Sequence, residues 1–224
     1  MSEKIIKVVI LAGGLGSRLS EFTKLIPKPM VKIGRRPIIE RIMDIYEKHG
    51  FNQFIIASGY KSKIIEKYFK FKKNVKVINT GKNTLTGLRL KKIQKYVGDT
   101  FFLTYGDGLS NVNIKQSLKF HISNKKSFTM TAVHPPARFG ELKLKKNEIM
   151  SFQEKPQLSE GWINGGFFVV EKKFFKYLDN SNVMLEREPF ERVIKSKDIR
   201  VFKHESFWQC MDTLRDYKYL NDLV

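Results

Sequence analysis

Short runs of apolar residues recur along the chain, and each is followed by glycine or by a polar turn. The runs cover residues 5–11, 54–58, 75–78, 101–105, 128–133 and 167–170. They are rich in β-branched and aromatic residues and do not alternate strictly with polar ones, which is typical of strands buried on both faces of a sheet. The pattern therefore predicts a buried, mostly parallel sheet.

Segments with helical periodicity separate these runs. One helix is predicted to begin at Pro37 and to stop at Gly50, with its inner face formed by Ile38, Ile42, Ile45 and Tyr46. A second is predicted over residues 62–70, with Ile65, Tyr68 and Phe69 pointing inward. Further helices are predicted over residues 86–96, 113–123 and 172–178, from 189 onward, and at the end of the chain through 223. Alternation of strands and helices at this spacing predicts βαβ units.

The composition changes after residue 135, where residues 138–144 and 149–154 favour antiparallel ribbons. The chain is therefore predicted to be α/β: a single Rossmann-like domain over residues 1–224, with a mixed, mostly parallel central sheet flanked by helices. A small antiparallel ribbon is expected at the substrate site. A chain of this length buries about 70% of its unfolded surface, so it needs no disulfide or metal to fold.

Cysteine content and charge restrict the cellular setting and the partners. The single cysteine, Cys210, cannot form an internal disulfide, and the chain starts with no secretory signal, so a cytoplasmic location is expected. No apolar run is long enough for a membrane helix, so no membrane partner is expected. The net charge of +20 would attract nucleic acid. The basic residues are spread over the whole chain in short pairs, which favours solvated faces that attract phosphorylated substrates over a nucleic-acid partner.

A glycine-rich loop follows the first predicted strand, in the sequence LAGGLGSRL. Gly13, Gly14 and Gly16 allow positive φ angles and leave no Cβ between main-chain N–H groups and a bound anion. Arg18 and Lys28 add two cations near the same place. The loop is thus predicted to bind phosphate groups.

Two better-known glycine motifs do not fit this loop. The dinucleotide fingerprint requires a third glycine where this chain has Leu19, so a hydride-transfer enzyme is not expected. The Walker motif requires Gly-Lys-Ser/Thr five residues after its first glycine, and Arg18 stands at that distance from Gly13.

Two acidic residues follow predicted strands far apart in the chain. Asp107 lies between Gly106 and Gly108 at the end of a buried strand, and Asp212 follows the last strand. The carboxyl edge of an α/β sheet is where ligands bind, so both carboxylates are expected there. Since Mg²⁺ uses one or two carboxylates together with phosphate oxygens, Asp107 and Asp212 are the predicted metal ligands.

Together these stretches resemble the sugar-phosphate nucleotidylyltransferases, and more closely their cytidylyltransferase branch. The resemblance rests on the glycine loop, on Pro27-Lys28-Pro29 and above all on the more specific stretches SFQEKP, GWINGGFF and FWQ-MDT, where Cys210 fills the gap. It implies transfer of a cytidylyl group from CTP to a sugar 1-phosphate, with glucose 1-phosphate as the expected acceptor, and a homo-oligomer. An acceptor phosphate is largely a dianion at neutral pH, since its second pKa is about 6, so it needs no general base and the four histidines are left out of the catalytic set.

The site residues follow from this chemistry and from the resemblance. The expected catalytic residues are Arg18, Lys28, Asp107 and Lys155. The expected nucleotide-binding residues are Leu11, Ala12, Gly13, Gly14, Gly16, Ser17, Thr86, Gly87 and Arg89, of which Thr86, Gly87 and Arg89 would lie beside the cytosine. The resemblance implies that Gly140, Glu154, Lys155 and Asn164 bind the sugar phosphate.

The chain departs from the family pattern in three places. The segment of residues 70–81 is short, Leu88 stands where a second glycine is usual, and His134 and Cys210 replace residues common near the acceptor site. Two alternatives stay open: transfer to a different phosphorylated acceptor, and a nucleotide-binding protein without turnover.

Overall fold

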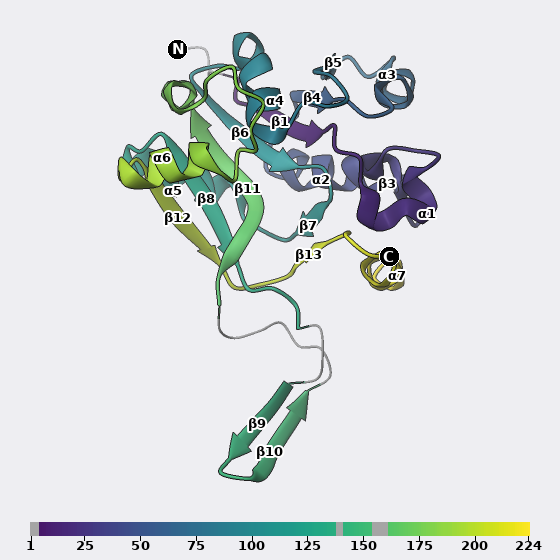
Figure 1. Ribbon diagram of the computed structural model, residues 1–224, viewed down its shortest axis with the longest axis vertical. Coiled ribbons are helices and arrows are strands. Elements are labelled where there is room, and N and C mark those ends of the chain that lie inside the picture. Colours follow the sequence, from purple (N-terminus) through teal and green to yellow (C-terminus); the bar gives the residue numbers. More distant parts are fainter. Residues whose placement is uncertain (1–4, 138–140, 154–160) are drawn as a thin grey trace.

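A seven-stranded sheet forms the centre of the computed structural model, which describes residues 5–137, 141–153 and 161–224 (Figure 1). Its strands lie in the order β12-β8-β11-β6-β1-β4-β5. Only β11 runs antiparallel to its neighbours, and every other pairing in this sheet is parallel. The predicted mixed, mostly parallel sheet is confirmed. The strand bounds are β1 Lys7–Ala12, β4 Phe54–Ser58, β5 Val75–Asn79, β6 Thr100–Tyr105, β8 Phe128–Val133, β11 Ile163–Glu171 and β12 Ile199–His204.

Helices cover both faces of this sheet, and alternate residues of β1 divide between the two sides. Val8, Ile10 and Ala12 belong to one apolar cluster, which is completed by α2 Ile38–Glu47, α3 Ser62–Phe69, α5 Ile114–Asn124 and α7 Leu214–Asp222. Val9 and Leu11 belong to the other, which is completed by α4 Thr86–Lys92, α6 Glu188–Lys195 and the 3-10 helix Lys172–Tyr177. Burial on both faces explains why the strand runs are continuously apolar.

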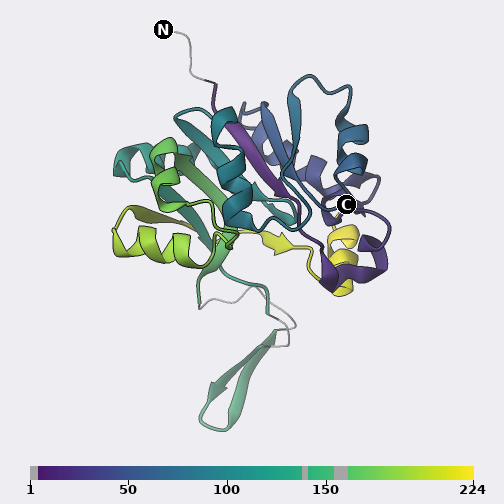
Figure 2. The same ribbon diagram turned by 45° about the horizontal axis from the view of Figure 1, so that its top comes forward.

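The smaller elements surround the ends of the sheet. Three two-stranded ribbons pair β2 Lys32–Ile33 with β3 Arg36–Pro37, β7 Gly108–Ser110 with β13 Trp208–Cys210, and β9 Glu141–Lys145 with β10 Glu148–Gln153. The short helix α1 Ser20–Thr23 and 3-10 turns at Ser17–Leu19, Lys28–Met30 and Gln94–Tyr96 complete the described elements. Figures 1 and 2 both show β9 and β10 extending away from the sheet.

The predicted elements are recovered with a few differences. The helix predicted over residues 86–96 is α-helical only to Lys92, and the one over 172–178 is a 3-10 helix. Tyr68 is 42% exposed, so its predicted inward position is wrong: α3 covers the sheet near its edge and buries only Ile65 and Phe69 of that set. The edge strand β12 was absent from the predicted strands because its sequence, IRVFKH, alternates instead of forming an apolar run.

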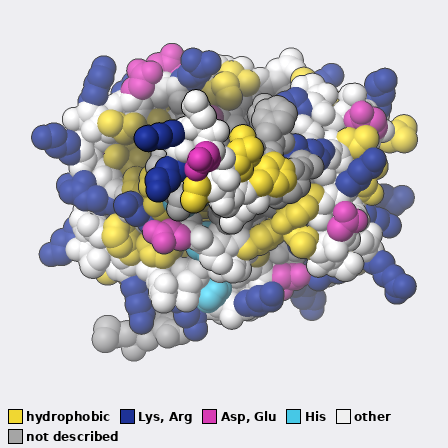
Figure 3. Space-filling model, turned by 90° about the horizontal axis from the view of Figure 1, so that it is seen from below, with side chains coloured by type: hydrophobic (Ala, Val, Ile, Leu, Met, Phe, Trp, Pro, Cys, Tyr) yellow, Lys and Arg dark blue, Asp and Glu magenta, His cyan; other side chains and the backbone are white. Residues whose placement is uncertain are grey.

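Basic side chains are spread over the face shown in Figure 3, as their distribution along the sequence predicts. Figure 3 shows lysine and arginine side chains distributed around one face without a continuous basic stripe. Across the described ranges, no helix is long and apolar enough to cross a membrane.

Candidate active site

A pocket lies beside β1, the strand from which the sheet is extended first to one side and then to the other. From β1 the chain builds β4 and β5 on one side and then returns to place β6 on the other side of β1. The carboxyl ends of β1 and β6 therefore border a crevice, which is where open α/β sheets bind ligands. The cavity there measures about 460 Å³, a size suited to a small ligand; it is lined by Leu11, Ala12, Gly13, Gly14, Gly16, Ser17, Arg18, Lys28, Pro29, Thr86, Arg89, Tyr105, Gly106, Asp107, Gly108, Asn164, Gly165, Gly166, Trp208, Cys210 and Asp212.

The glycine loop forms one wall of this pocket. Gly16 adopts φ +65°, which favours glycine, and it precedes the 3-10 turn Ser17–Leu19. A Cβ on Gly13 would overlap the guanidinium of Arg89, whereas a Cβ on Gly14 would meet nothing within 4 Å. Arg89 therefore packs against the loop at Gly13, whereas the space next to Gly14 is free of protein atoms. A loop that binds an anion requires such free space beside its backbone N–H groups.

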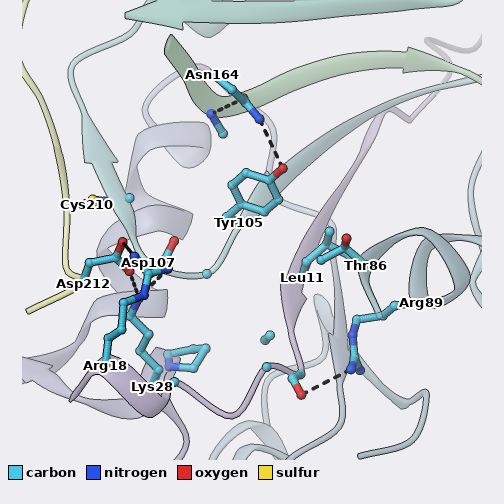
Figure 4. A pocket seen from close by; sticks show the side chains of 18 of the residues that line it. Leu11, Arg18, Lys28, Thr86, Arg89, Tyr105, Asp107, Asn164, Cys210 and Asp212 are labelled. Carbon is cyan, nitrogen blue, oxygen red and sulfur yellow. Dashed lines mark hydrogen bonds and ion pairs between the residues drawn. The ribbon is translucent and has the colours of Figure 1, made fainter. Parts of the chain in front are cut away.

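Four charged side chains gather at one end of the pocket (Figure 4). The Lys28 Nζ lies 2.7 Å from an Asp107 oxygen and 2.5 Å from an Asp212 oxygen, and Arg18 donates to the other Asp212 oxygen at 2.6 Å. Burial lowers the pKa of Lys28, but the two carboxylates outweigh it and hold that pKa above its usual range. The two predicted metal ligands therefore face one point, which the ammonium of Lys28 occupies.

The structure corrects the expected route by which Asp212 reaches this point. Asp107 follows β6 of the main sheet, but Asp212 follows β13, which pairs with β7 in a separate antiparallel ribbon. The Met211 N–H donates to the Asp107 carbonyl at 2.8 Å, so backbone pairing holds the two acidic residues together. The prediction that both follow strands of one sheet is wrong, although their proximity is as expected.

Arg89 lines the opposite end of the pocket, but its guanidinium is directed into the protein. It donates to the carbonyl oxygens of Ser58 at 2.6 Å and Gly13 at 3.2 Å, and also to Gly81, Thr84 and the Thr80 hydroxyl. Burial lowers its pKa to about 10. Among its described partners there is no carboxylate, so Arg89 joins the glycine loop to the ends of β4 and β5 and places a positive charge behind the loop.

Thr86, Tyr105 and Asn164 connect the two ends of the pocket. Asn164 Nδ2 donates to the Tyr105 hydroxyl at 3.2 Å, and Figure 4 shows Tyr105 between Asn164 and the charged group. Trp208 donates from Nε1 to the Gly165 carbonyl at 2.7 Å. A Cβ on Gly166 would lie 2.6 Å from the Tyr105 ring, so the absence of a side chain at this position permits the close packing.

Most predicted site residues therefore line one pocket. Gly87 does not line it: the Gly87 N–H donates to the Val183 carbonyl at 3.1 Å, and its missing Cβ leaves room for that backbone. Gly140, Glu154 and Lys155 lie outside the described residues. Five further residues line the pocket but were not among the predicted site residues: Pro29, Tyr105, Gly165, Gly166 and Trp208. Each falls within or beside a stretch that carries the family resemblance.

The two departures near the acceptor site lie in different surroundings. His134 Nδ1 donates a hydrogen bond to the Gly161 carbonyl at 2.9 Å, and the imidazole packs against Trp162 with ring centroids 3.9 Å apart. Cys210 lines the pocket, where burial, followed by Asp212 and Asp107, raises its pKa to about 12. Its thiol therefore stays protonated at neutral pH.

The described residues contain no group of three or more His, Cys, Asp or Glu side chains that could hold a metal alone. A metal at this pocket would depend on two carboxylates and on ligand oxygens. That donor set suits a hard cation such as Mg²⁺ and not a transition metal that prefers sulfur or nitrogen.

Comparison with known proteins now identifies the family. The model of the family described as nucleotidyl transferase matches residues 7–211. This chain belongs to that family. It is 42% identical over 244 residues to the glucose-1-phosphate cytidylyltransferases of Salmonella typhimurium and of Salmonella typhi, covering 97% of this chain and 95% of each relative. The structure of the inositol-1-phosphate CTP transferase from T. maritima shares the fold, with a TM-score of 0.74 at 17% identity over 100% of this chain and 98% of that one.

The alignment with the Salmonella proteins also bears on chain length. It spans 244 positions, which is more than the 224 residues of this chain. The relatives therefore carry additional residues within the matched region.

Proposed function

We propose that this protein transfers a cytidylyl group from CTP to a sugar 1-phosphate, releasing pyrophosphate and forming a CDP-sugar. The observation that carries the proposal is the meeting of Asp107, Asp212 and Lys28 beside an open glycine loop, within a chain 42% identical to glucose-1-phosphate cytidylyltransferases. Glucose 1-phosphate is the proposed acceptor for the same reason.

The chemistry is an in-line displacement at the α-phosphorus. The acceptor phosphate attacks as a dianion, the bond to the pyrophosphate oxygen breaks, and negative charge grows on the leaving group. Backbone N–H groups of Gly14 and Gly16 would hold the triphosphate. Arg18, whose side chain is 74% exposed, would turn from Asp212 to the pyrophosphate, and Lys28 would contact the transferred phosphate.

Mg²⁺ is the proposed cofactor, held by Asp107 and Asp212. When bound, it would neutralise the repulsion among the phosphate oxygens and between the two carboxylates. The carboxylates share the ammonium of Lys28, and this arrangement supports the proposal of a cation between them. Lys28 would then be released from its two partners and become available to the nucleotide.

The acceptor would lie on the side of Asn164. By family resemblance Lys155 would bind its phosphate, and Glu154, Gly140 and Asn164 would contact its hydroxyl groups. A different phosphorylated acceptor is the main alternative, because Cys210 contributes a thiol to the pocket at a position where the family resemblance implies another residue. A nucleotide-binding protein without turnover is less well supported, since binding alone does not require two carboxylates facing one cation.

A panel of nucleotides and acceptors tests the proposal. CTP, UTP, dTTP and GTP are each paired with glucose 1-phosphate and with other sugar phosphates, and pyrophosphate release is measured. CTP with glucose 1-phosphate should be strongly preferred, because a site that hydrogen-bonds the cytosine amino group leaves a buried group unpaired with uracil. EDTA should abolish turnover and Mg²⁺ should restore it. Equal rates with UTP or dTTP, or full activity in EDTA, would contradict the proposal.

We also propose a homo-oligomer in the cytoplasm. The oligomer is supported by large apolar side chains exposed on the ribbon β9–β10, among them Ile149 at 64% and Phe152 at 60%. The cytoplasmic location is supported by the single cysteine and by the proposed nucleotide substrate.

A further inference from the structure

Glu186 is a half-buried residue two positions before α6, and it does not line the pocket. Its carboxylate nevertheless accepts hydrogen bonds from two residues that do. The Thr86 hydroxyl donates to one oxygen at 2.7 Å, and the Tyr105 hydroxyl donates to the other. Thr86 belongs to the wall proposed to bind cytosine, whereas Tyr105 contacts Asn164 on the wall proposed to bind the sugar. One carboxylate thus joins the two walls.

The carboxylate also fixes the direction of the hydrogen bonds. An ionised carboxylate only accepts, so both hydroxyl protons must point toward Glu186. The Tyr105 oxygen then accepts from Asn164 Nδ2, and the Asn164 oxygen accepts from the Gly166 N–H at 2.9 Å. Asn164 consequently has a second amide N–H to offer to the pocket, which suits a hydroxyl or phosphate oxygen of an acceptor.

The protonation of Tyr105 supports this direction. Burial, followed by the charge of Glu186, raises the pKa of Tyr105 far above its usual value, so the phenol keeps its proton. The ring is also held in place: it packs edge-on against Phe168, with centroids 5.5 Å apart, and against the backbone of Gly166. Because the Tyr105 hydroxyl proton is directed to Glu186, the Tyr105 oxygen accepts from Asn164 and so fixes the orientation of the Asn164 amide.

The segment that carries Glu186 is attached closely to α4. The Leu185 N–H donates to the Thr86 hydroxyl at 2.8 Å, and the Gly87 N–H donates to the Val183 carbonyl at 3.1 Å. Asn182 accepts from the Leu85 N–H at 2.8 Å. The Thr86 hydroxyl therefore donates to Glu186 and accepts from the backbone beside it, which leaves it little freedom to rotate.

We propose that Glu186 is a positioning residue. It orients Thr86 directly and orients Asn164 through Tyr105, so that one carboxylate fixes the side chains of both the nucleotide wall and the sugar wall of the pocket. The proposal rests on the proposed function for the identity of the two ligands. It predicts that one change outside the pocket alters the use of both substrates.

The first test is Glu186→Gln, with Glu188→Gln as the matched control on the exposed first turn of α6. Glutamine replaces one acceptor oxygen by an N–H donor, which repels the hydroxyl proton opposite it and turns the side chain, so both hydroxyl groups lose their alignment with residue 186. KM for CTP and for the sugar 1-phosphate should therefore each rise about tenfold, which corresponds to about 1.4 kcal/mol. Glu188→Gln should match the wild type in both.

The second test separates positioning from general damage. If Glu186 reaches Asn164 only through the Tyr105 hydroxyl, then in a Tyr105→Phe background Glu186→Gln should still raise KM for CTP but no longer change KM for the sugar phosphate. Fully additive effects on the sugar phosphate, or an increase in only one KM for the single variant, would overturn the proposal.

Two variants at the residues that contact Glu186 test the proposal if Glu186→Gln cannot be used. If Glu186→Gln does not fold, Thr86→Val and Tyr105→Phe each remove one arm of the network. The proposal then requires the former to impair mainly CTP use and the latter mainly sugar-phosphate use, and the reverse pattern would overturn it. Wild-type protein without activity on CTP and glucose 1-phosphate would refute the proposed function instead, and the same comparison would then be made with the substrates found in the panel.

Discussion

At the scale of single residues, the ammonium group of Lys28 has two observed partners, Asp107 and Asp212, and one proposed partner, the transferred phosphate. In the structure its side chain, only 12% exposed, neutralises Asp107 and Asp212, and in the proposed reaction it would contact the transferred phosphate. Removing its charge should therefore affect both catalysis and the affinity of the two carboxylates for a cation.

Lys28→Gln should lower kcat about 100-fold or more, the size expected when a preorganised cation is lost at developing charge. It should also increase the rise in melting temperature that Mg²⁺ alone produces, because the carboxylates then repel each other without an internal cation. Steady-state kinetics and thermal melts with and without Mg²⁺ measure the two effects. Lys32→Gln, at an exposed position, is the control, and an active Lys28→Gln variant would contradict the role.

At the scale of elements, a buried histidine joins α5 to the sheet. His121 shares hydrogen bonds with Thr129 of β8 at 2.8 Å and with Glu171 of β11 at 3.1 Å. Burial lowers the pKa of His121, and Glu171 only partly offsets this. The folded state therefore favours neutral imidazole, whereas the unfolded chain titrates near its ordinary pKa of about 6.5.

The sign of the resulting pH dependence follows from this difference. The unfolded chain binds the proton more readily, so the contribution of His121 to stability is present above about pH 6.5 and is lost as the pH falls through its lower folded pKa. The melting temperature of the wild type should fall on acidification, and that of His121→Gln should start lower but fall less steeply. His49→Gln is the control: burial lowers the pKa of His49 too, but His49 is less buried, so its effect should be smaller. Parallel curves for wild type and His121→Gln would exclude this role.

At the scale of the whole molecule, the ribbon β9–β10 exposes apolar side chains that the described part of the same chain leaves uncovered. Phe152 pairs across the ribbon with Leu142, which is 48% exposed, and Ile149 lies one pleat further along. A two-stranded ribbon is marginally stable by itself, and exposed apolar patches mark interfaces. These features fit the proposed oligomer. That residues 1–224 form a single domain stays a prediction.

Replacing Ile149 and Phe152 together by serine should shift the protein toward the monomer, because both lose the apolar area that an interface would bury. Light scattering coupled to size-exclusion chromatography measures the mass. Lys145→Ser, an exposed polar position on the same ribbon, should leave the mass unchanged. A monomeric wild type would contradict the oligomer.

Much of the fold and part of the site were predictable from the sequence because local rules govern them. Continuous apolar runs predict strands buried on both faces, and the spacing between them leaves room for helices, so the mixed sheet followed from the pattern. The glycine loop and the Asp-Gly turn at Asp107 were also visible, since each combines a residue type with a position at a strand end. These features depend on neighbours in the chain.

Other features depend on residues that only the fold brings together. Asp212 reaches Asp107 through the β7–β13 ribbon, and no pattern in either segment predicts that pairing. Arg89 was predicted to lie beside the cytosine. In the structure its guanidinium is surrounded by four backbone carbonyls and a hydroxyl group from separate turns. Glu186 belongs to no motif, and its carboxylate gains a role because Thr86 and Tyr105, 100 and 81 positions away in the chain, meet it in space. The sequence determined which chemical groups are available, and the tertiary structure decided their partners, because a hydrogen bond depends on distance and direction in space and not on separation along the chain.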